Sequence, residues 1–150
     1  TSLPGWLSLS AQRWEFTGGA HGNPWSEALV WDKASGARLK PIDLFTSKAA
    51  LTAAIQAPFC DQIDKQRAEK RGEPVVRGSD DLFSDCIDPA QSTVILGSSD
   101  KQHFTRIGVL VDPYEAGPYA EGTYEATVPV TAAVLKAVKP QYRAAFAVQR

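Results

Sequence analysis

The chain contains no methionine and only two cysteines and two histidines among its 150 residues. A catalytic metal site needs about three protein ligands, and His21, His103 and the scattered carboxylates form no metal-binding motif such as HExxH. We therefore expect neither a metal ion nor another cofactor. Because the chain starts at Thr1 and lacks methionine, we expect a processed product whose targeting segment lies outside this sequence.

Long hydrophobic runs and an excess of either charge are also missing. No run approaches the roughly 18 residues of a membrane helix, so we expect no membrane span in this chain. Sixteen basic and seventeen acidic residues leave a net charge of −1, and the one dense basic group lies between Lys65 and Arg77. Nucleic acid is therefore not an expected partner. At 150 residues the chain is long enough to form a single domain.

Cys60 and Cys86 are the only cysteines, and their spacing fits neither a CxxC redox pair nor a zinc site. They form either one disulfide or two free thiols. We favour the disulfide, which would tie the irregular, polar segment 71–89 back to the preceding helix. A disulfide in turn favours an oxidising compartment.

Hydrophobic periodicity predicts both strands and helices. Strands are expected at residues 6–16, 25–32, 92–96, 102–111 and 123–130. In the first strand the hydrophobic residues move from odd to even positions, which predicts a bulge near Gln12 and Arg13. The turn at residues 32–36 predicts a hairpin that returns through a short strand at residues 38–40.

A helix is expected from Thr46 or Ser47 to about Lys70, because hydrophobic residues recur there at every fourth position. Pro58 lies inside this helix and predicts a kink or a split. Shorter helices should follow Thr131 and Pro140. Strands joined by hairpins, with helices inserted late, predict an α+β fold in which helices pack on one face of a mainly antiparallel sheet.

Two loops have compositions that indicate a defined conformation. The first joins the first two strands and contains Gly18, Gly19, His21, Gly22 and Asn23. The second precedes the last strand and contains Tyr114, Glu115, Gly117, Tyr119 and Gly122. Glycines permit positive φ, and Pro113 and Pro118 stiffen the turns of the second loop. Their aromatic side chains either hold the turns through hydrogen bonds or stack on a ligand such as a sugar ring or a partner protein.

Motifs for catalysis are weak. There is no GxSxG motif, and the formal SxxK match at Ser98–Lys101 lies in a hairpin loop, where a turn is expected. Asp43, Glu115 and Glu121 are carboxylates near turns that would suit glycan hydrolysis, although the sequence does not determine their separation. We therefore assign no catalytic residue.

The two loops, together with the turn at residues 32–36 and the following Ile42-Asp43-Leu44-Phe45, resemble a bacterial family, the domain of unknown function 3298. This domain occurs at the C-terminus of RsiV-type anti-sigma factors and beside the catalytic domain of PdaC-type peptidoglycan deacetylases. The resemblance covers about residues 14–140. It implies an extracytoplasmic domain, often in lipoproteins, with an α+β fold and no established catalytic residues.

The resemblance places His21 and Asn23 in a glycine–histidine loop, and Tyr114, Gly117, Tyr119 and Gly122 in a tyrosine–glycine loop. RsiV-type members bind lysozyme through this region, and deacetylase members act on cell-wall glycan. Members also carry a preceding strand-rich segment, of which residues 1–16 would be the remnant. The cysteine-containing segment 72–90 is longer than the family pattern leads us to expect.

We therefore expect a periplasmic or surface-attached module, without catalytic activity, that binds or senses cell-wall glycan or a lysozyme-like protein. The expected contact residues are His21, Asn23, Tyr114, Glu115 and Tyr119. The expected loop-shaping residues are Gly18, Gly19, Gly22, Gly117 and Gly122. Two alternatives stay open: a wall-glycan hydrolase or deacetylase-associated enzyme that uses His21 and Glu115, and a purely structural accessory domain.

Overall fold

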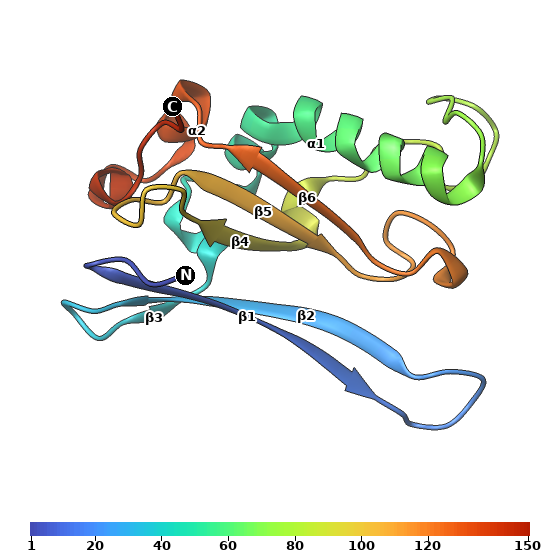
Figure 1. The fold of residues 1–150 in the computed structure, drawn as a ribbon, viewed down its shortest axis with the longest axis horizontal. Coiled ribbons are helices and arrows are strands. Elements are labelled where there is room, and N and C mark those ends of the chain that lie inside the picture. The colour runs from blue at the N-terminus through green and yellow to red at the C-terminus, as the bar shows by residue number, and fades with distance from the viewer.

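Two antiparallel three-stranded sheets and a layer of helices form the computed structural model, which describes residues 1–150 (Figure 1). The first sheet contains β1 (Trp6–Glu15), β2 (Asn23–Asp32) and β3 (Arg38–Leu39). The second contains β4 (Thr93–Gly97), β5 (Arg106–Val111) and β6 (Tyr124–Pro129). The helices cover one face of the second sheet, and the first sheet lies on its other side. The expected α+β class with antiparallel strands is confirmed, although the strands divide into two sheets.

The helical layer is dominated by α1 (Lys48–Arg71). The Ser47 hydroxyl caps it by accepting a hydrogen bond from the backbone N–H of Ala50, and Gly72 ends it in the left-handed conformation with φ 75°. The remaining helices are short: α2 (Ala132–Ala137), η1 (Pro41–Leu44), η2 (Pro89–Gln91), η3 (Tyr119–Glu121) and η4 (Pro140–Ala145). None of the helices combines the length and the hydrophobicity needed to cross a membrane.

Pro58 lies inside one continuous α1, so of the predicted kink or split the split is wrong. Pro58 is exposed, and Ala54, whose carbonyl loses its partner, is only partly buried, so water can reach that carbonyl. The opposite side of the helix packs against the second sheet both before and after the proline. This buried stripe comprises Leu51, Ile55, Phe59 and Ile63.

The hydrophobic core lies between α1 and the second sheet. Alternate side chains of β6 are buried, as its sequence pattern predicts, and β5 adds a nearly continuous buried run. The core residues from these two strands are Ile107, Val109, Val111, Tyr124, Ala126 and Val128. The second sheet thereby fixes the position of the chain segment that follows β5.

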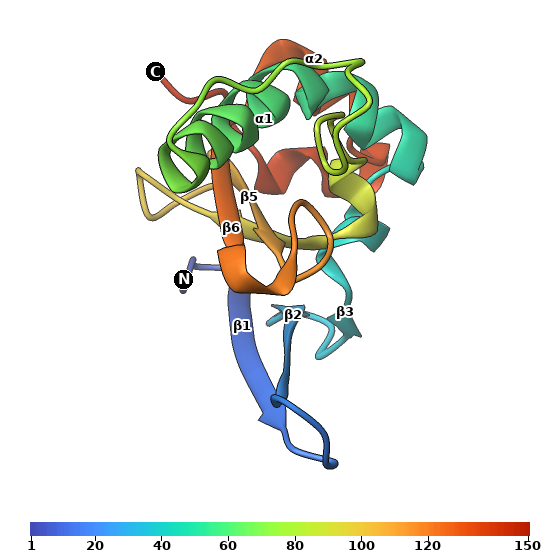
Figure 2. The ribbon, with the colours of Figure 1, turned by 90° about the vertical axis from the view of Figure 1, so that its right-hand side faces the viewer.

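The β1–β2 hairpin pairs without interruption from Trp6 opposite Asp32 to Glu15 opposite Asn23, so the expected bulge is absent. The hydrophobic pattern changes for a different reason. Near the body of the molecule, Ser8 and Val30 are buried against the second sheet. From Leu9 onward every residue of β1 is exposed, because the distal half of the hairpin projects beyond the core (Figure 2). Because no hydrophobic core lies against this half of the hairpin, its hydrophobic residues are not confined to one face of the strand.

Strand β5 starts at Arg106, four residues later than predicted, because Asp100 holds the preceding residues in a loop. Its carboxylate accepts hydrogen bonds from the backbone N–H groups of Gln102 and His103, both at 2.8 Å. These bonds, with the contact to the His103 ring, keep the pKa of Asp100 well below its ordinary value. Residues 98–101 form the expected turn and not a catalytic helix start.

The predicted disulfide is present: Cys60 on α1 is bonded to Cys86, with Cα atoms 5.5 Å apart. It attaches the irregular segment between α1 and η2 to the helix. Arg77 adds a second attachment through ion pairs with Asp61 and Asp64. The segment therefore has a defined position beside α1 although it contains no regular secondary structure.

Candidate ligand-binding site

The glycine–histidine loop and the tyrosine–glycine loop lie at the same end of the molecule (Figure 1), and their side chains meet at the distal half of the β1–β2 hairpin. The imidazole of His21 stacks on the ring of Tyr119, with centroids 3.6 Å apart and 13° between the planes. The ring of Tyr114 lies 5.5 Å from that of Tyr119 and 6.3 Å from that of His21. Side chains almost one hundred residues apart in the sequence thus form one group.

Hydrogen bonds orient these rings. The Tyr119 hydroxyl donates to the carbonyl oxygen of Gly22 at 3.1 Å, and His21 Nδ1 lies 3.0 Å from the same oxygen. Because a carbonyl can only accept, this second contact requires a proton on Nδ1. His21 Nε2 lies 3.5 Å from the Tyr114 hydroxyl oxygen. The polar edges of His21 and Tyr119 are therefore used inside the loops, while the Tyr114 side chain remains 58% exposed.

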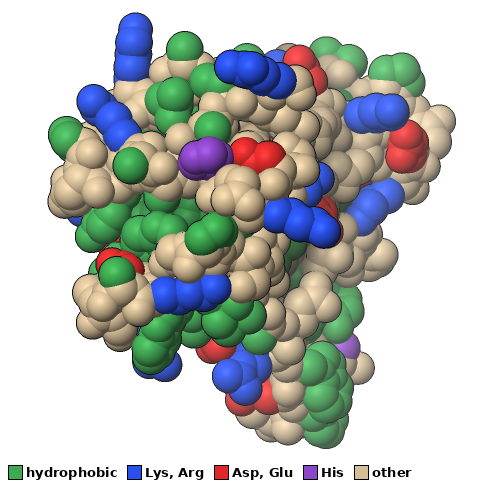
Figure 3. All heavy atoms as spheres, turned by 60° about the vertical axis from the view of Figure 1, so that its left-hand side comes forward, with side chains coloured by type: hydrophobic (Ala, Val, Ile, Leu, Met, Phe, Trp, Pro, Cys, Tyr) green, Lys and Arg blue, Asp and Glu red, His purple; other side chains and the backbone are tan.

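Trp14 and Phe16 extend this group along the hairpin. Their rings are stacked, with 11° between the planes, and they are 65% and 57% exposed. A Cβ atom at Gly22 would lie 2.2 Å from the Trp14 indole, so only glycine lets the indole lie against the loop. We call Trp14, Phe16, His21, Tyr114 and Tyr119 the aromatic cluster. Figure 3 shows hydrophobic side chains gathered on the projecting end of the molecule, beside a histidine.

Glycines occupy positions in both loops where a Cβ atom would be strained or would clash. Gly18 and Gly19 turn the hairpin with φ 104° and 93°, values that residues with a Cβ atom rarely adopt. In the second loop, a Cβ atom at Gly117 would lie 2.0 Å from a carboxylate oxygen of Glu121. Glycine at 117 therefore allows the Glu121 side chain to fold beneath the loop.

The loop of residues 112–122 is attached to the end of α1. The Arg71 guanidinium donates two hydrogen bonds to the Glu121 carboxylate at 2.8 and 3.0 Å, and the Tyr124 hydroxyl donates a third at 2.5 Å. Arg71 holds the pKa of Glu121 below its ordinary value, and burial raises the pKa of Tyr124 to about 12. Arg67, which is fully buried, donates from Nε to the Ala116 carbonyl at 2.8 Å.

The start of the same loop is attached to β2 and to the residue that follows η2. The Asp112 carboxylate accepts from the backbone N–H and the hydroxyl of Ser26 at 3.0 and 2.7 Å. The Ser92 hydroxyl donates to Glu115 at 2.5 Å. Burial raises the pKa of Glu115, and the nearby charge of Asp112 raises it further despite the Ser92 hydrogen bond.

The structure does not bring all the predicted site residues together. Asn23 is exposed opposite Glu15 and takes no part in the aromatic contacts. Glu115 is hydrogen-bonded to Ser92, and no hydrogen bond joins it to His21. No group of three or more His, Cys, Asp or Glu side chains could hold a metal ion.

Trp14 and Phe16 were not predicted as site residues, because their change of position in the strand pattern was explained by a bulge. A usable signal was present in the sequence. Two large aromatic residues at positions i and i+2, directly before a glycine-rich turn, lie at the end of a hairpin, where a core rarely extends. Such residues are candidates for contact with a ligand.

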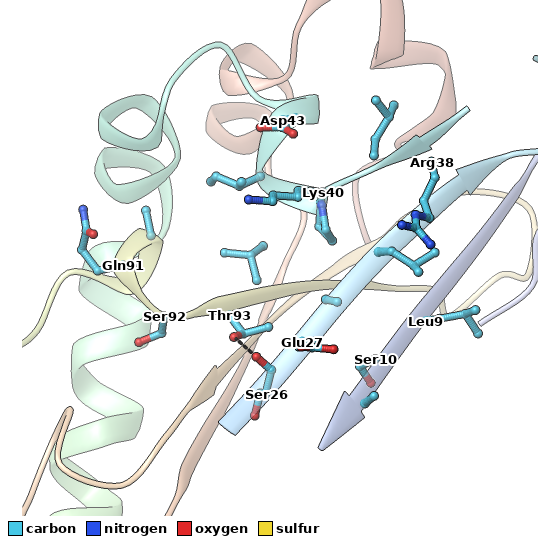
Figure 4. A pocket seen from close by; sticks show the side chains of 18 of the residues that line it. Leu9, Ser10, Ser26, Glu27, Arg38, Lys40, Asp43, Gln91, Ser92 and Thr93 are labelled. Carbon is cyan, nitrogen blue, oxygen red and sulfur yellow. Dashed lines mark hydrogen bonds between the residues drawn. The ribbon is translucent and has the colours of Figure 1, made fainter. Parts of the chain in front are cut away.

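A groove of about 1,100 Å³ lies on another side of the same hairpin (Figure 4). Strands β1, β2 and β3 form one wall, and η1, η2 and the start of β4 form the other. Ser26 and Ser92, which hold the loop of residues 112–122, line this groove. The groove and the aromatic cluster therefore share a supporting loop.

In comparisons with known proteins, no family model matches the chain and no curated protein matches its sequence. The resemblance to the domain of unknown function 3298 stays a prediction. The cluster and the groove are therefore the features of the molecule that bear on its function.

Gly22→Ala should displace the Trp14 indole, because the new methyl group would occupy its position. We expect a shifted indole N–H resonance for Trp14 and a loss of about 1 kcal/mol in the free energy of unfolding, at the low end for overpacking because the indole can move into solvent. Gly5→Ala is the matched control, since nothing lies within 4 Å of a Cβ atom there. An unchanged Trp14 resonance in Gly22→Ala would contradict the described packing.

Glu115→Gln should stabilise the protein at neutral pH. Because the folded-state pKa of Glu115 is raised, the ionised form is disfavoured in the folded state. The stabilising contribution of the carboxyl is full below the unfolded pKa of about 4.3 and is lost as the pH rises through the folded-state pKa. Thermal denaturation should therefore show a higher Tm for the variant at pH 7 and no gain at pH 3.5. An equal gain at both pH values would contradict this origin.

Proposed function

We propose that this chain is a non-catalytic, extracytoplasmic binding domain that holds a cell-wall glycan against the aromatic cluster. The observation that carries the proposal is that Trp14, Phe16 and Tyr114 are more than half exposed. Gly22 links the two loops, because the Trp14 indole lies against it and the Tyr119 hydroxyl donates to its carbonyl. Large aromatic side chains are normally buried, and an exposed group of them marks a surface that contacts another molecule.

The chemistry of the cluster suits sugar rings. A pyranose ring presents a flat face of C–H groups, and stacking this face on an aromatic ring removes hydrophobic surface from water. The rings of Trp14 and Phe16, whose planes are within 11° of parallel, offer flat aromatic faces of this kind. His21 and Tyr119 are already held by the Gly22 carbonyl, so little side-chain freedom is lost when a ligand binds.

The location outside the cytoplasm is supported by the Cys60–Cys86 disulfide and by the resemblance described above. Disulfides persist mainly in oxidising compartments. A cell-wall ligand is consistent with such a compartment.

A lysozyme-like protein is the second candidate ligand, and the outer face of the hairpin favours it. Leu9 and Trp31 are 46% and 42% exposed, and the strand register places both on the face opposite to Trp14. Tryptophan and tyrosine are also the residues that most often dominate protein interfaces. A protein that contacts both faces of the hairpin would use Trp31 as well as Trp14. A substitution of Trp31 should therefore weaken the binding of a protein ligand and leave the binding of a glycan unchanged.

The glycan proposal is tested by calorimetric titration with a neutral hexamer of N-acetylglucosamine. Trp14→Ala and Tyr114→Ala should each weaken binding by about two- to tenfold, the range expected for losing one stacking contact. Trp31→Ala is the matched control and should bind like wild type.

Three results would count against the glycan proposal. Heat with lysozyme alone, reduced by Trp31→Ala, would favour the protein ligand. Release of new reducing ends from the hexamer would favour the hydrolase alternative. An absence of heat with both titrants would favour a purely structural domain.

A further inference from the structure

The groove on the other side of the hairpin concentrates positive charge on a chain whose net charge is −1. Four basic side chains (Arg13, Arg38, Lys40 and Lys48) and two acidic ones (Glu27 and Asp43) line it, so its own balance is +2. Figure 4 shows Arg38, Lys40 and Asp43 toward one end, and Ser26 and Ser92 toward the other.

Most of this positive charge has no partner within the protein. Arg13 is paired with Glu27 at 3.1 Å, which neutralises both. Arg38, Lys40 and Lys48 form no ion pair or hydrogen bond through their side chains, although Asp43 lines the same groove. Lys48 is also the first residue of α1, whose N-terminus carries a partial positive charge of its own.

The other basic group of the molecule differs in this respect. Arg67, Lys70, Arg71 and Arg77 are all bonded to carbonyl or carboxylate oxygens of the protein. Their charged groups are therefore used in contacts within the protein. The three unpaired cations of the groove are instead free to bind an anion in a concave site.

The groove is continuous with the support of the aromatic cluster. Ser26 lines the groove and holds Asp112, and Ser92 lines the groove and holds Glu115. The loop that starts at these two contacts carries Tyr114 and Tyr119. A ligand that lies on the cluster and is several residues long would therefore approach the groove.

We propose that the groove binds the carboxylate groups of an acidic wall glycan, such as the peptide carboxylates of a muropeptide, through Arg38, Lys40 and Lys48. The inference rests on the proposed function, since the sugar rings of the same ligand contact the aromatic cluster. The guanidinium of Arg38 can bind a carboxylate through two parallel hydrogen bonds, and the two lysines act as point charges. The cluster supplies contact with sugars in general, and the groove selects acidic ones.

The test compares a disaccharide tetrapeptide that has free carboxylates with the same molecule after its carboxylates are converted to amides. Wild type should bind the acidic form about tenfold more tightly at low salt, and the difference should shrink as salt is added. Arg38→Gln and Lys40→Gln should each reduce the ratio about two- to fivefold, as expected for exposed ion pairs. The double variant should bind both forms almost equally.

Lys65→Gln is the matched control, because Lys65 is an exposed cation of α1 outside the groove. It should leave the ratio unchanged, and an equal effect would show general charge attraction and overturn the assignment. The neutral hexamer should bind the double variant as it binds wild type, which verifies folding and the cluster. Equal binding of both muropeptide forms by wild type would overturn the groove inference alone. If wild type binds neither the hexamer nor the muropeptides, the proposed function is overturned, and the groove inference with it.

Discussion

The contacts of Arg67 and Arg71 with the loop of residues 112–122 are the interaction on which the candidate site depends. Both residues lie in the last turns of α1, and their side chains donate hydrogen bonds to this loop. Arg67 donates to the Ala116 carbonyl and Arg71 to the Glu121 carboxylate. Arg67 is fully buried, and its Nη2 has no hydrogen-bond partner. Burying a charged group is costly unless it is well bonded, so the contacts of its other nitrogens must offset this cost.

This attachment matters because the distal half of the hairpin has no hydrophobic core beneath it. Its position is maintained by polar contacts to the same loop, from Ser26 to Asp112 and from Tyr119 to Gly22. The position of the aromatic cluster therefore depends on a chain of contacts. Helix α1 packs on the second sheet, its arginines hold the loop of residues 112–122, and this loop holds the hairpin. A ligand at the cluster would contact a surface whose two halves come from different layers of the fold.

Local patterns in the sequence were sufficient for most of the fold. The four-residue spacing from Leu51 to Ile63 predicted α1, the alternation from Tyr124 to Val128 predicted β6, and the two cysteines formed the favoured disulfide. The bulge in β1 was wrong because it assumed a buried face where the hairpin projects into solvent. The division of the strands into two sheets depends on packing between distant segments, which local periodicity does not record.

The candidate site was predictable only in part. Gly22 and Tyr119 belong to loops whose compositions indicated order, but their contact joins positions far apart in the chain. The groove was missed because Arg38, Lys40 and Lys48 do not form a dense run. The dense basic group between Lys65 and Arg77 was visible in the sequence, and the structure uses most of it in internal contacts. Charge that is free to bind a ligand is therefore a property of the fold rather than of local composition.

The most direct test of the central claim is a titration of the isotope-labelled protein with the N-acetylglucosamine hexamer, followed by NMR. If the two loops form one binding surface, the Trp14 indole N–H and the backbone N–H groups of Gly22 and Tyr119 should shift together along one saturation curve. Shifts confined to one loop, or to the outer face around Trp31, would contradict the claim that the aromatic cluster is the binding site.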